Sequence, residues 1–427
     1  MGRPTDRRTL VLGANVYDYG TDAGAWRAPG EDPLRPFRAE FWRDTARTAE
    51  RAGLDAVFLA DTPGLSSNPA IRPMRQLEPL AALAVVAAET EHLGAIATVS
   101  TSTTDPVELS RRLLSFGAFS GGRFGWNVVT GVTGPAVADF GFTAPPGRDD
   151  RYARAEEFVD AVAAFLAAVR DDTDYRHDGP LFAARIPRDR LGVDPAVRAL
   201  LPDAAPLVVQ AGGSPRGRAL AARSAEAVFA AETVHAGALA NAEDLRRRAA
   251  ALGRPAPLIL PGIHLVVGST EAEAEERFTL IHERGPEGNL LRRFSAMFGI
   301  DGSRLDLDAP AEEELARLAT DPEATPVGFR TAIAAYGAAG GLSVRQLLRY
   351  FAGFGHQLFV GTPERLADIM TEWLDSGAAD GFNLLFDTNP WGLREFADHV
   401  TPVLRARGLL ADAPGAPFAR RMREARR

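Results

Sequence analysis

The sequence of 427 residues contains no cysteine and no lysine, so all 48 of its basic residues are arginines. The absence of cysteine excludes thiol nucleophiles, disulfide bonds, cysteine-ligated zinc and iron–sulfur clusters. The absence of lysine excludes pyridoxal-phosphate and Schiff-base chemistry, and also the lysine-containing phosphate loop of nucleotidases. Whole classes of enzyme are therefore removed before any motif is considered.

Long apolar runs and an excess of positive charge are also missing. No apolar run approaches the roughly 20 residues that cross a bilayer, and residues 1–8 lead into a strand-like run instead of a signal-peptide core. The net charge of -8 argues against a nucleic-acid-binding protein. The basic segment 420–427 is interpreted as a solvated, frayed end. We therefore expect a cytoplasmic protein that binds neither nucleic acid nor membrane.

Strand-like and helix-like segments alternate along almost the whole chain. The eight expected strands are 10–15, 56–61, 95–100, 123–130, 207–211, 227–231, 258–267 and 382–387. Helical patterns between them include 41–52, 78–92, 106–119, 152–169 and 363–376. Eight strands that each precede a helix predict an α/β fold of the (β/α)8 TIM-barrel type, since their continuous apolar character fits a parallel sheet buried on both faces. A doubly wound open sheet is the structural alternative.

The chain is longer than the roughly 250 residues of a simple TIM barrel. We expect a single domain over residues 1–427, with the surplus in two insertions and in a C-terminal tail at 411–427. The larger insertion is a mostly helical segment at about 271–356, before the last strand, and the smaller one is at about 173–206. Core packing is the favoured interpretation of the larger insertion and a lid over the site is the alternative. In both cases we expect it to carry most of the substrate specificity.

Polar residues stand where the expected strands end, and a TIM barrel binds its ligand at these carboxyl ends. Asn127 is the most informative of them, because it lies in a strand that is otherwise apolar. Asp61 and Thr98 follow the same pattern, although each by itself is typical of a loop entry. The fifth strand runs into Gly213 and Ser214 at the start of a helix. This arrangement predicts an anion site, most simply for a phosphate, and fits an ordinary helix cap equally well.

Several motifs, taken in order, resemble the bacterial-luciferase-like flavin monooxygenases. The branch is the one that contains nitrilotriacetate monooxygenase component A, dibenzothiophene-sulfone monooxygenase and the large subunit of pristinamycin IIA synthase. The motifs are GAWR at 24–27, VFLAD at 57–61, SGGRFGWNVVT at 120–130, RYARAEEF at 151–158, QAGGS at 210–214, VGTPE at 360–364 and GAADGFN at 377–383. The GWNVVT string and the order of the series are specific, whereas each of the other motifs is weak by itself.

The resemblance implies an enzyme that receives reduced FMN by diffusion from a separate NAD(P)H:FMN reductase, reacts it with O2 and inserts one oxygen atom into a small or medium organic substrate. It implies that the isoalloxazine and ribityl groups contact Asp61, Thr98, Asn127 and Tyr152, and that Gly213 and Ser214 hold the phosphate. A site of hydroxyls, amides and aromatic rings suits this chemistry, which requires that water be excluded. Assembly into a homo-oligomer is a further expectation from the resemblance.

The chain departs from the family pattern at three places. Arg148 stands where the family has a histidine, either as a fixed positive charge near the flavin or as a solvated loop residue. Ala28 replaces a histidine after Trp26 and Arg27, and Asp139 replaces an asparagine. The last two changes fall where we expect the substrate. Trp26 and Arg27 are therefore expected to contact the substrate, whose identity does not transfer from a relative.

Two histidines are the main acid–base candidates. His264 lies within an expected strand and is interpreted as a core or wall residue whose hydrogen bonds are satisfied. His356 lies where the family often has a Gly-His pair, so it is the candidate catalytic residue at the rim of the pocket. No pair or triad of residues has the spacing of metal ligands, and no metal is expected.

Two other functions remain open. A deazaflavin-dependent oxidoreductase that transfers hydride would use the same fold, and an oxygen-uptake assay would distinguish it from an oxygenase. A non-catalytic flavin-binding or partner-binding subunit would bind FMN without oxygen-dependent turnover.

Overall fold

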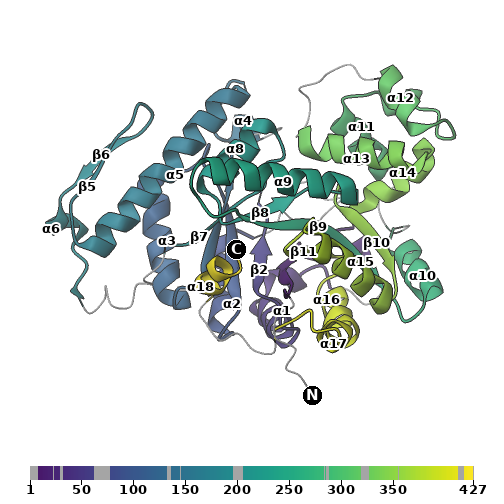
Figure 1. The fold of residues 1–427 in the computed structure, drawn as a ribbon, viewed down its shortest axis with the longest axis horizontal. Helices are drawn as coiled ribbons and strands as arrows, with labels where there is room; N and C mark the ends of the chain where they lie inside the picture. The colour runs from purple at the N-terminus through teal and green to yellow at the C-terminus, as the bar shows by residue number, and fades with distance from the viewer. Residues whose placement is uncertain are drawn as a thin grey trace.

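The computed structural model describes residues 8–22, 24–28, 32–61, 77–131, 136–144, 146–195, 205–282, 284, 288–318, 327–353, 355–411 and 418–426, and the statements below concern these residues. Helices surround a central sheet, a cluster of helices lies at one side of it and a β-hairpin lies at the opposite side (Figure 1). None of the described helices is both long and apolar enough to span a membrane.

Eight parallel strands form a closed barrel. They are β1 (Val11–Asn15), β2 (Ala56–Leu59), β3 (Gly94–Ser100), β4 (Phe124–Val129), β7 (Leu207–Gln210), β8 (Ala227–Ala230), β9 (Leu258–Val267) and β11 (Gly381–Phe386). Each strand pairs with the next in this series, and β11 pairs with β1. The predicted (β/α)8 barrel is confirmed, and each predicted strand end lies within two residues of the observed one. The open-sheet alternative is wrong because the sheet closes.

A layer of helices covers the barrel. It consists of α1 (Ala39–Arg51), α2 (Pro79–Ala88), α3 (Pro106–Ser120), α5 (Arg148–Asp171), α8 (Pro215–Ser224), α9 (His235–Ala251) and α15 (Pro363–Ser376), with α16 (Trp391–Glu395), η5 (Phe396–Val400) and α17 (Thr401–Ala406) after the last strand. Local signals set the ends of these helices. In α3, the Asp105 carboxylate accepts hydrogen bonds from the first-turn amides, and Gly121 ends the helix with a φ of 61°.

Side chains alternate between the two faces of each strand. In β1, Leu12 and Ala14 pack outward against the helices, whereas Val11 points into the barrel. The amino-terminal half of the barrel interior is apolar and is filled by one cluster, made of Val11, Ala56, Phe58, Ile96, Leu207, Val209, Ala227, Phe229, Leu258 and Leu260 together with Phe418 and Met422. The last two residues belong to α18 (Phe418–Glu424), which therefore closes the amino-terminal end of the barrel. A Cβ on Gly94 would lie 2.5 Å from the Phe418 ring, so this contact requires glycine.

The basic C-terminal segment is not a frayed end, and its interpretation as solvated is wrong for Arg421, Arg423 and Arg426, whereas Arg420 is exposed. Arg423 donates hydrogen bonds to the Glu226 carboxylate and, at 2.8 Å, to the Ala205 carbonyl. Arg426 donates to two further backbone carbonyls at 2.8 and 3.0 Å. Arg421 pairs with Asp55 at 3.4 Å. The high charge of the segment led to the expectation that water solvates it. The structure instead provides hydrogen-bond acceptors for these arginines at the amino-terminal end of the barrel.

Two excursions leave the barrel. Between α5 and β7, the antiparallel strands β5 (Tyr175–Asp178) and β6 (Ala183–Ile186) form a hairpin that precedes α6 (Arg188–Leu191). Glu157 of α5 holds the hairpin turn, because its carboxylate accepts hydrogen bonds from the amides of Leu181 and Phe182. Between β9 and α15 lie α10 (Glu271–His282), α11 (Asn289–Phe298), η3 (Gly302–Arg304), α12 (Ala311–Leu318), α13 (Val327–Gly340), α14 (Val344–Tyr350), η4 (Phe351–Gly353) and β10 (Gln357–Gly361).

The helices of the second excursion have an apolar core of their own, which includes Phe294, Ile333, Leu347 and Phe351. The excursion returns to the barrel through β10, a strand that the sequence analysis did not predict. β9 pairs with β8 through its first four residues and with β10 through its last five. At its carboxyl end β9 therefore lies between β10 and β11.

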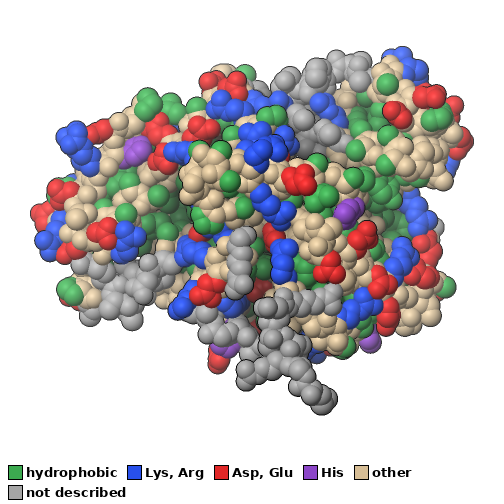
Figure 2. All heavy atoms as spheres, in the orientation of Figure 1, with side chains coloured by type: hydrophobic (Ala, Val, Ile, Leu, Met, Phe, Trp, Pro, Cys, Tyr) green, Lys and Arg blue, Asp and Glu red, His purple; other side chains and the backbone are tan. Residues whose placement is uncertain are grey.

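Arginine and acidic side chains are interspersed over the face of the molecule in Figure 2. Many of them form exposed ion pairs, such as those of Glu108 with Arg111 and Arg112 at 2.8 and 2.9 Å. Exposed pairs of this kind contribute little to stability. The barrel core and the plug formed by α18 account for more of it.

Candidate functional site

The barrel interior becomes polar toward the carboxyl ends of the strands. Five inward-facing polar side chains lie on five strands, and each is no more than 3% exposed: Asn15, Thr98, Asn127, His264 and Asn383. Their orientation follows from the alternation, because residues two or four positions earlier on their strands, such as Val11, Ile96 and Leu260, belong to the apolar interior cluster. The mouth of this barrel is where a TIM-barrel enzyme places its active site.

Thr98 and Asn127 lie opposite each other on β3 and β4, so two of the predicted site residues are in direct contact. The Asn127 Nδ2 donates a hydrogen bond of 3.0 Å to the Thr98 Oγ1. The Asn127 Oδ1 is buried and has no hydrogen-bond partner in the described part of the chain. A buried carbonyl oxygen in this condition costs about 1–3 kcal/mol. Because this oxygen lies at the barrel mouth, it is placed to contact a bound ligand.

Tyr152 and Ser214 bring the first turns of α5 and α8 together. The Tyr152 hydroxyl oxygen lies 3.1 Å from the Ser214 Oγ. Ser214 also caps α8, since its Oγ accepts a hydrogen bond of 3.1 Å from the Gly217 amide. Gly213 is exposed, and its carbonyl accepts a hydrogen bond of 2.9 Å from Arg218. The cap and an anion site are compatible, because the dipole and free amides of a helix N-terminus still attract a negative charge.

Two arginines beside this pair were missed by the sequence analysis, which named only the half-buried Arg148 at the first position of α5. Arg151 precedes Tyr152, and Arg216 is the second residue of α8. The Nε of each is buried without a hydrogen-bond partner among the described residues. Guanidinium donors suit phosphate oxygens. The signal was present in the sequence, because Arg151 begins the RYARAEEF motif and Arg216 lies two residues after the QAGGS motif.

Trp26 and Arg27 lie in the short helix η1 (Ala25–Arg27), after β1. The Arg27 guanidinium stacks on the Trp26 ring at 4.3 Å from its centroid and donates a hydrogen bond of 3.1 Å to the Arg284 carbonyl. The Trp26 Nε1 is buried and without a partner in the described residues. These two residues therefore form one unit at the β1 side of the mouth. Asp61 lies half-buried two residues after β2.

His356 lies directly over β9. A Cβ on Gly262 would be 2.1 Å from the His356 Nδ1, so this packing requires glycine. Burial and the neighbouring His264 lower the pKa of His356 to about 4. His356 is therefore neutral at pH 7.

His264 is fully buried, as expected of a core or wall residue. The Ala352 backbone contacts its ring, but at least one ring nitrogen has no hydrogen-bond partner among the described residues, so its hydrogen bonds are only partly satisfied. The strand alternation directs the ring inward, on the same face of β9 as Gly262. Burial lowers the pKa of His264, while the carboxylates of Asp22 and Asp387 act in the opposite direction. The net effect is a neutral imidazole in the wall of the mouth.

Two buried carboxylates, which the sequence analysis did not name, stand beside His264. The Asp387 carboxylate forms a bidentate ion pair with Arg277 of α10 at 2.5 and 2.8 Å, and the Arg277 guanidinium also lies over the Trp391 ring. Asp22 accepts hydrogen bonds from the Gly24 amide at 2.7 Å and from His282 at 3.4 Å. Burial alone would raise the pKa of Asp22, but these hydrogen bonds lower it below the ordinary value. Asp22 is therefore ionised at neutral pH.

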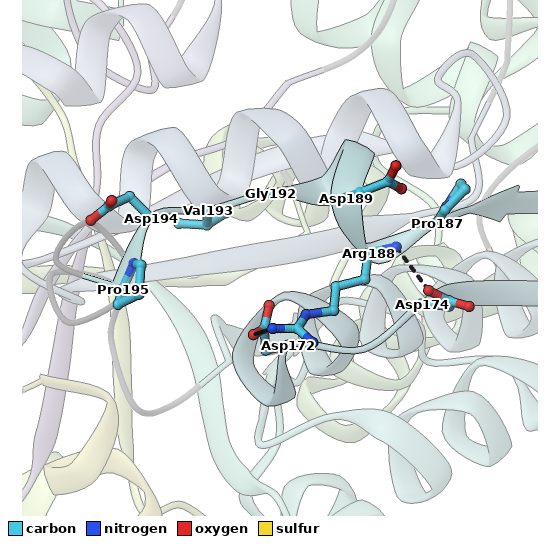
Figure 3. A pocket seen from close by; sticks show the side chains of 9 residues that line it. All are labelled: Asp172, Asp174, Pro187, Arg188, Asp189, Gly192, Val193, Asp194 and Pro195. Atoms are coloured by element: carbon cyan, nitrogen blue, oxygen red, sulfur yellow. Dashed lines mark hydrogen bonds and ion pairs between the residues drawn. The ribbon is translucent and has the colours of Figure 1, made fainter.

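A separate pocket of about 710 Å³ lies in the first excursion (Figure 3). It is lined by Asp172, Asp174, Pro187, Arg188, Asp189, Gly192, Val193, Asp194 and Pro195. Arg188 crosses it, with an ion pair to Asp172 at 2.6 Å and an amide hydrogen bond to Asp174 at 2.8 Å. This pocket follows the end of α5 and so lies away from the barrel mouth. Within the described residues, no group of three or more histidines and carboxylates is arranged to hold a metal ion.

Known proteins share this arrangement along most of the chain. The sequence pattern of the Luciferase-like monooxygenase family matches residues 20–380. The chain belongs to this family. Nitrilotriacetate monooxygenase component A of Aminobacter aminovorans is 33% identical, and one of the chains of pristinamycin IIA synthase from Streptomyces pristinaespiralis is 36% identical. Each alignment covers 94% of this chain and 93% of the relative. The resemblance drawn from the motifs is confirmed, and the protein is an enzyme of the monooxygenase class.

Solved structures give the same result for this luciferase-like monooxygenase. The EDTA monooxygenase of Chelativorans sp. BNC1 is 30% identical, with a TM-score of 0.78 over 98% of both chains. A riboflavin lyase, RcaE, whose structure contains a modified FMN, is 26% identical, with a TM-score of 0.78 over 98% of this chain and 96% of its own.

Proposed function

We propose that this protein is the oxygenating component of a two-component monooxygenase. It takes up reduced FMN from a separate NAD(P)H-dependent FMN reductase and uses O2 to oxygenate a small or medium organic substrate. Because the chain belongs to this family, its cofactor is reduced FMN and its co-substrate is O2. The observation that carries the proposal is the buried, unpartnered Oδ1 of Asn127 at the barrel mouth. When bound, reduced FMN supplies the electrons that activate O2.

The residues at the start of α5 and α8 fit the phosphate end of FMN. The Tyr152 and Ser214 hydroxyls, the amides at the N-terminus of α8 and the Nε donors of Arg151 and Arg216 would bind the phosphate oxygens. Gly213 leaves the backbone accessible there, and Arg148 would add positive charge at the start of α5.

The residues on β2, β3 and β4 fit the polar edge of the isoalloxazine and the ribityl hydroxyls. The Asn127 Oδ1 would accept a hydrogen bond from this edge, and Thr98 holds the carboxamide in position through its 3.0 Å hydrogen bond. Asp61, at the end of β2, would contact the same ligand. The buried walls of the mouth exclude water from these contacts, which protects reactive oxygen species from side reactions with solvent.

His356 is the proposed catalytic residue. Because it is neutral at pH 7, its ring presents one N–H donor and one acceptor nitrogen, and it serves to orient and transfer a proton without adding charge. Trp26 and Arg27 are the proposed substrate contacts at the β1 side of the mouth. Assembly into a homo-oligomer and a cytoplasmic location remain predictions.

Titration with reduced FMN under argon, followed by mixing with air-saturated buffer, tests the proposal. We expect saturable binding of reduced FMN and reoxidation that is slower for bound flavin than for free flavin, because the mouth excludes water. Binding of a reduced deazaflavin in place of reduced FMN would contradict the proposal and favour a hydride-transfer enzyme. Binding of FMN without any change in its reaction with O2 would favour a non-catalytic role.

A further inference from the structure

The barrel mouth has two halves, and the proposed flavin contacts occupy only one of them. Asp61, Thr98 and Asn127 lie on or directly after β2, β3 and β4, and the candidate phosphate residues follow at α5 and α8. The strands β9, β11 and β1 are adjacent to one another on the opposite side. This half, which we call the second half, carries three polar side chains that the flavin proposal does not use: Asn15, His264 and Asn383.

The strand register places these three side chains on three adjacent strands, in two neighbouring layers of the barrel interior. Asn383 lies between Gly13 of β1 and Gly262 of β9. One layer higher, Leu385 lies between Asn15 and His264. A Cβ added to Gly13 would have the Asn383 Oδ1 as its nearest neighbour, at 3.7 Å. The glycine therefore leaves room beside the carboxamide.

All three side chains have unsatisfied hydrogen-bonding capacity. The Oδ1 atoms of Asn15 and Asn383 are buried without partners in the described residues, and His264, which has one backbone contact with Ala352, leaves at least one ring nitrogen without a partner there. Each such group is costly to maintain in a folded protein, and their occurrence on three adjacent strands is more than a local packing defect. Two carboxamide oxygens accept hydrogen bonds, and a neutral imidazole donates one and accepts one. A complementary ligand must therefore supply N–H or O–H donors.

The charges around this half disfavour an anionic ligand. The buried Asp22 carboxylate lies close enough to affect the pKa of His264, and it is ionised. Arg277, a buried cation on α10, is already held by both carboxylate oxygens of Asp387. A carboxylate brought to His264 would lose its hydration and would be repelled by the Asp22 carboxylate.

We propose that Asn15, His264 and Asn383 bind an uncharged organic substrate bearing amide N–H or hydroxyl groups. This assignment rests on the proposed function, because it requires that FMN occupy the half formed by β2, β3 and β4. The substrate then lies across the barrel mouth from the flavin contacts. An uncharged wall also holds the substrate without adding a charge next to the flavin.

The test uses amide–carboxylate pairs that share one skeleton: acetamide and acetate, benzamide and benzoate, nitrilotriacetamide and nitrilotriacetate. Saturation-transfer NMR is recorded on the FMN-saturated full-length protein and on the variants His264→Leu, His264→Gln and Asn383→Leu. Asn241→Leu is the matched control, because its Oδ1 is also buried and unpartnered in the described part of the chain but lies on α9 in the outer layer. The dissociation constant of FMN is measured on the same samples.

We expect the amide of at least one pair to give a stronger signal than its carboxylate. His264→Leu and Asn383→Leu should reduce that signal at least fivefold, His264→Gln should retain part of it, and Asn241→Leu should leave it unchanged. The dissociation constant of FMN should change less than twofold in all four variants. The assignment is overturned if carboxylates bind as well as amides, if no amide binds, or if the amide signal survives both His264→Leu and Asn383→Leu. Failure of the wild-type protein to bind FMN would instead overturn the proposed function.

Discussion

The two ends of the barrel differ in whether their polar groups have hydrogen-bond or ion-pair partners. At the amino-terminal end, α18 covers an apolar cluster, and the charged groups around it are paired: Arg423 with Glu226 and Arg421 with Asp55. At the carboxyl end, Asn127 and His264 are more deeply buried than these arginines, but the Asn127 Oδ1 and at least one His264 ring nitrogen lack partners among the described residues. One end is built for stability and the other holds polar groups ready for a ligand, so substitutions at the two ends should change different measured quantities.

The largest effect is expected from Phe418→Ala at the plugged end. It removes a fully buried ring from the interior cluster and should lower the free energy of unfolding by about 3–5 kcal/mol. Denaturant unfolding measures this change. The affinity for reduced FMN should remain within about twofold of the wild-type value, because the flavin contacts lie at the other end. A large loss of FMN affinity in a folded variant would abolish the distinction between the ends.

Arg423→Ala should have the next largest effect, about 1.5–3 kcal/mol on the free energy of unfolding, because it leaves the largely buried carboxylate of Glu226 with fewer donors. Arg420→Ala is the matched control on the same helix. The Arg420 pair with Glu424 is exposed, and its loss should leave the free energy of unfolding nearly unchanged. Equal effects of the two substitutions would show that α18 is not docked as described.

Asn127→Leu at the mouth should weaken FMN binding and leave stability nearly unchanged, the reverse of the substitutions at the plugged end. It removes an unpartnered carbonyl oxygen, which favours stability, and also the hydrogen bond to Thr98, which opposes it, so thermal stability should change little. The dissociation constant of reduced FMN should rise about 10-fold to 100-fold, which corresponds to about 1.4–2.8 kcal/mol. Calorimetric titration under argon measures the affinity, and thermal unfolding provides the second value. A destabilised variant with normal FMN affinity would indicate that Asn127 is a structural residue.

The smallest effect concerns Glu232, which follows β8 at the mouth. Burial raises the pKa of Glu232 from 4.5 to about 7, although Arg218 opposes the shift. The protonated carboxyl is therefore favoured by folding, and its contribution to stability is fully present below pH 4.5 and is lost as the pH rises to 7. Glu232→Gln should match the wild type at about pH 4.5 and should be about 1–2 kcal/mol more stable at about pH 8. Denaturant unfolding at both values checks this, and a difference that does not depend on pH would contradict it.

The sequence predicted the barrel well because each strand is a short, continuous apolar run between turn residues. It missed β10, a short strand that directly follows the long helical excursion and pairs only with the end of β9. It also misjudged α18, because an arginine-rich segment has the same composition whether its acceptors are water or Glu226 and backbone carbonyls.

The candidate site was predictable where a polar residue interrupts an apolar strand or where a helix begins with a recognisable motif. Asn127, Tyr152 and Ser214 were found in this way, and the contacts of Asn127 with Thr98 and of Tyr152 with Ser214 appear in the structure. The partly unsatisfied state of His264 and the buried ion pair between Arg277 and Asp387 were not predictable. They depend on which strands and helices meet, and a single sequence does not contain that information.

A crystal structure of the protein with FMN bound tests the account most directly. We predict the phosphate against Ser214 and Tyr152, the isoalloxazine within hydrogen-bonding distance of the Asn127 Oδ1, and the wall of Asn15, His264 and Asn383 left clear of the flavin. Density for the flavin against His264 and Asn383, with Asn127 still unpartnered, would contradict both the proposed FMN site and the assignment of the second half to the substrate.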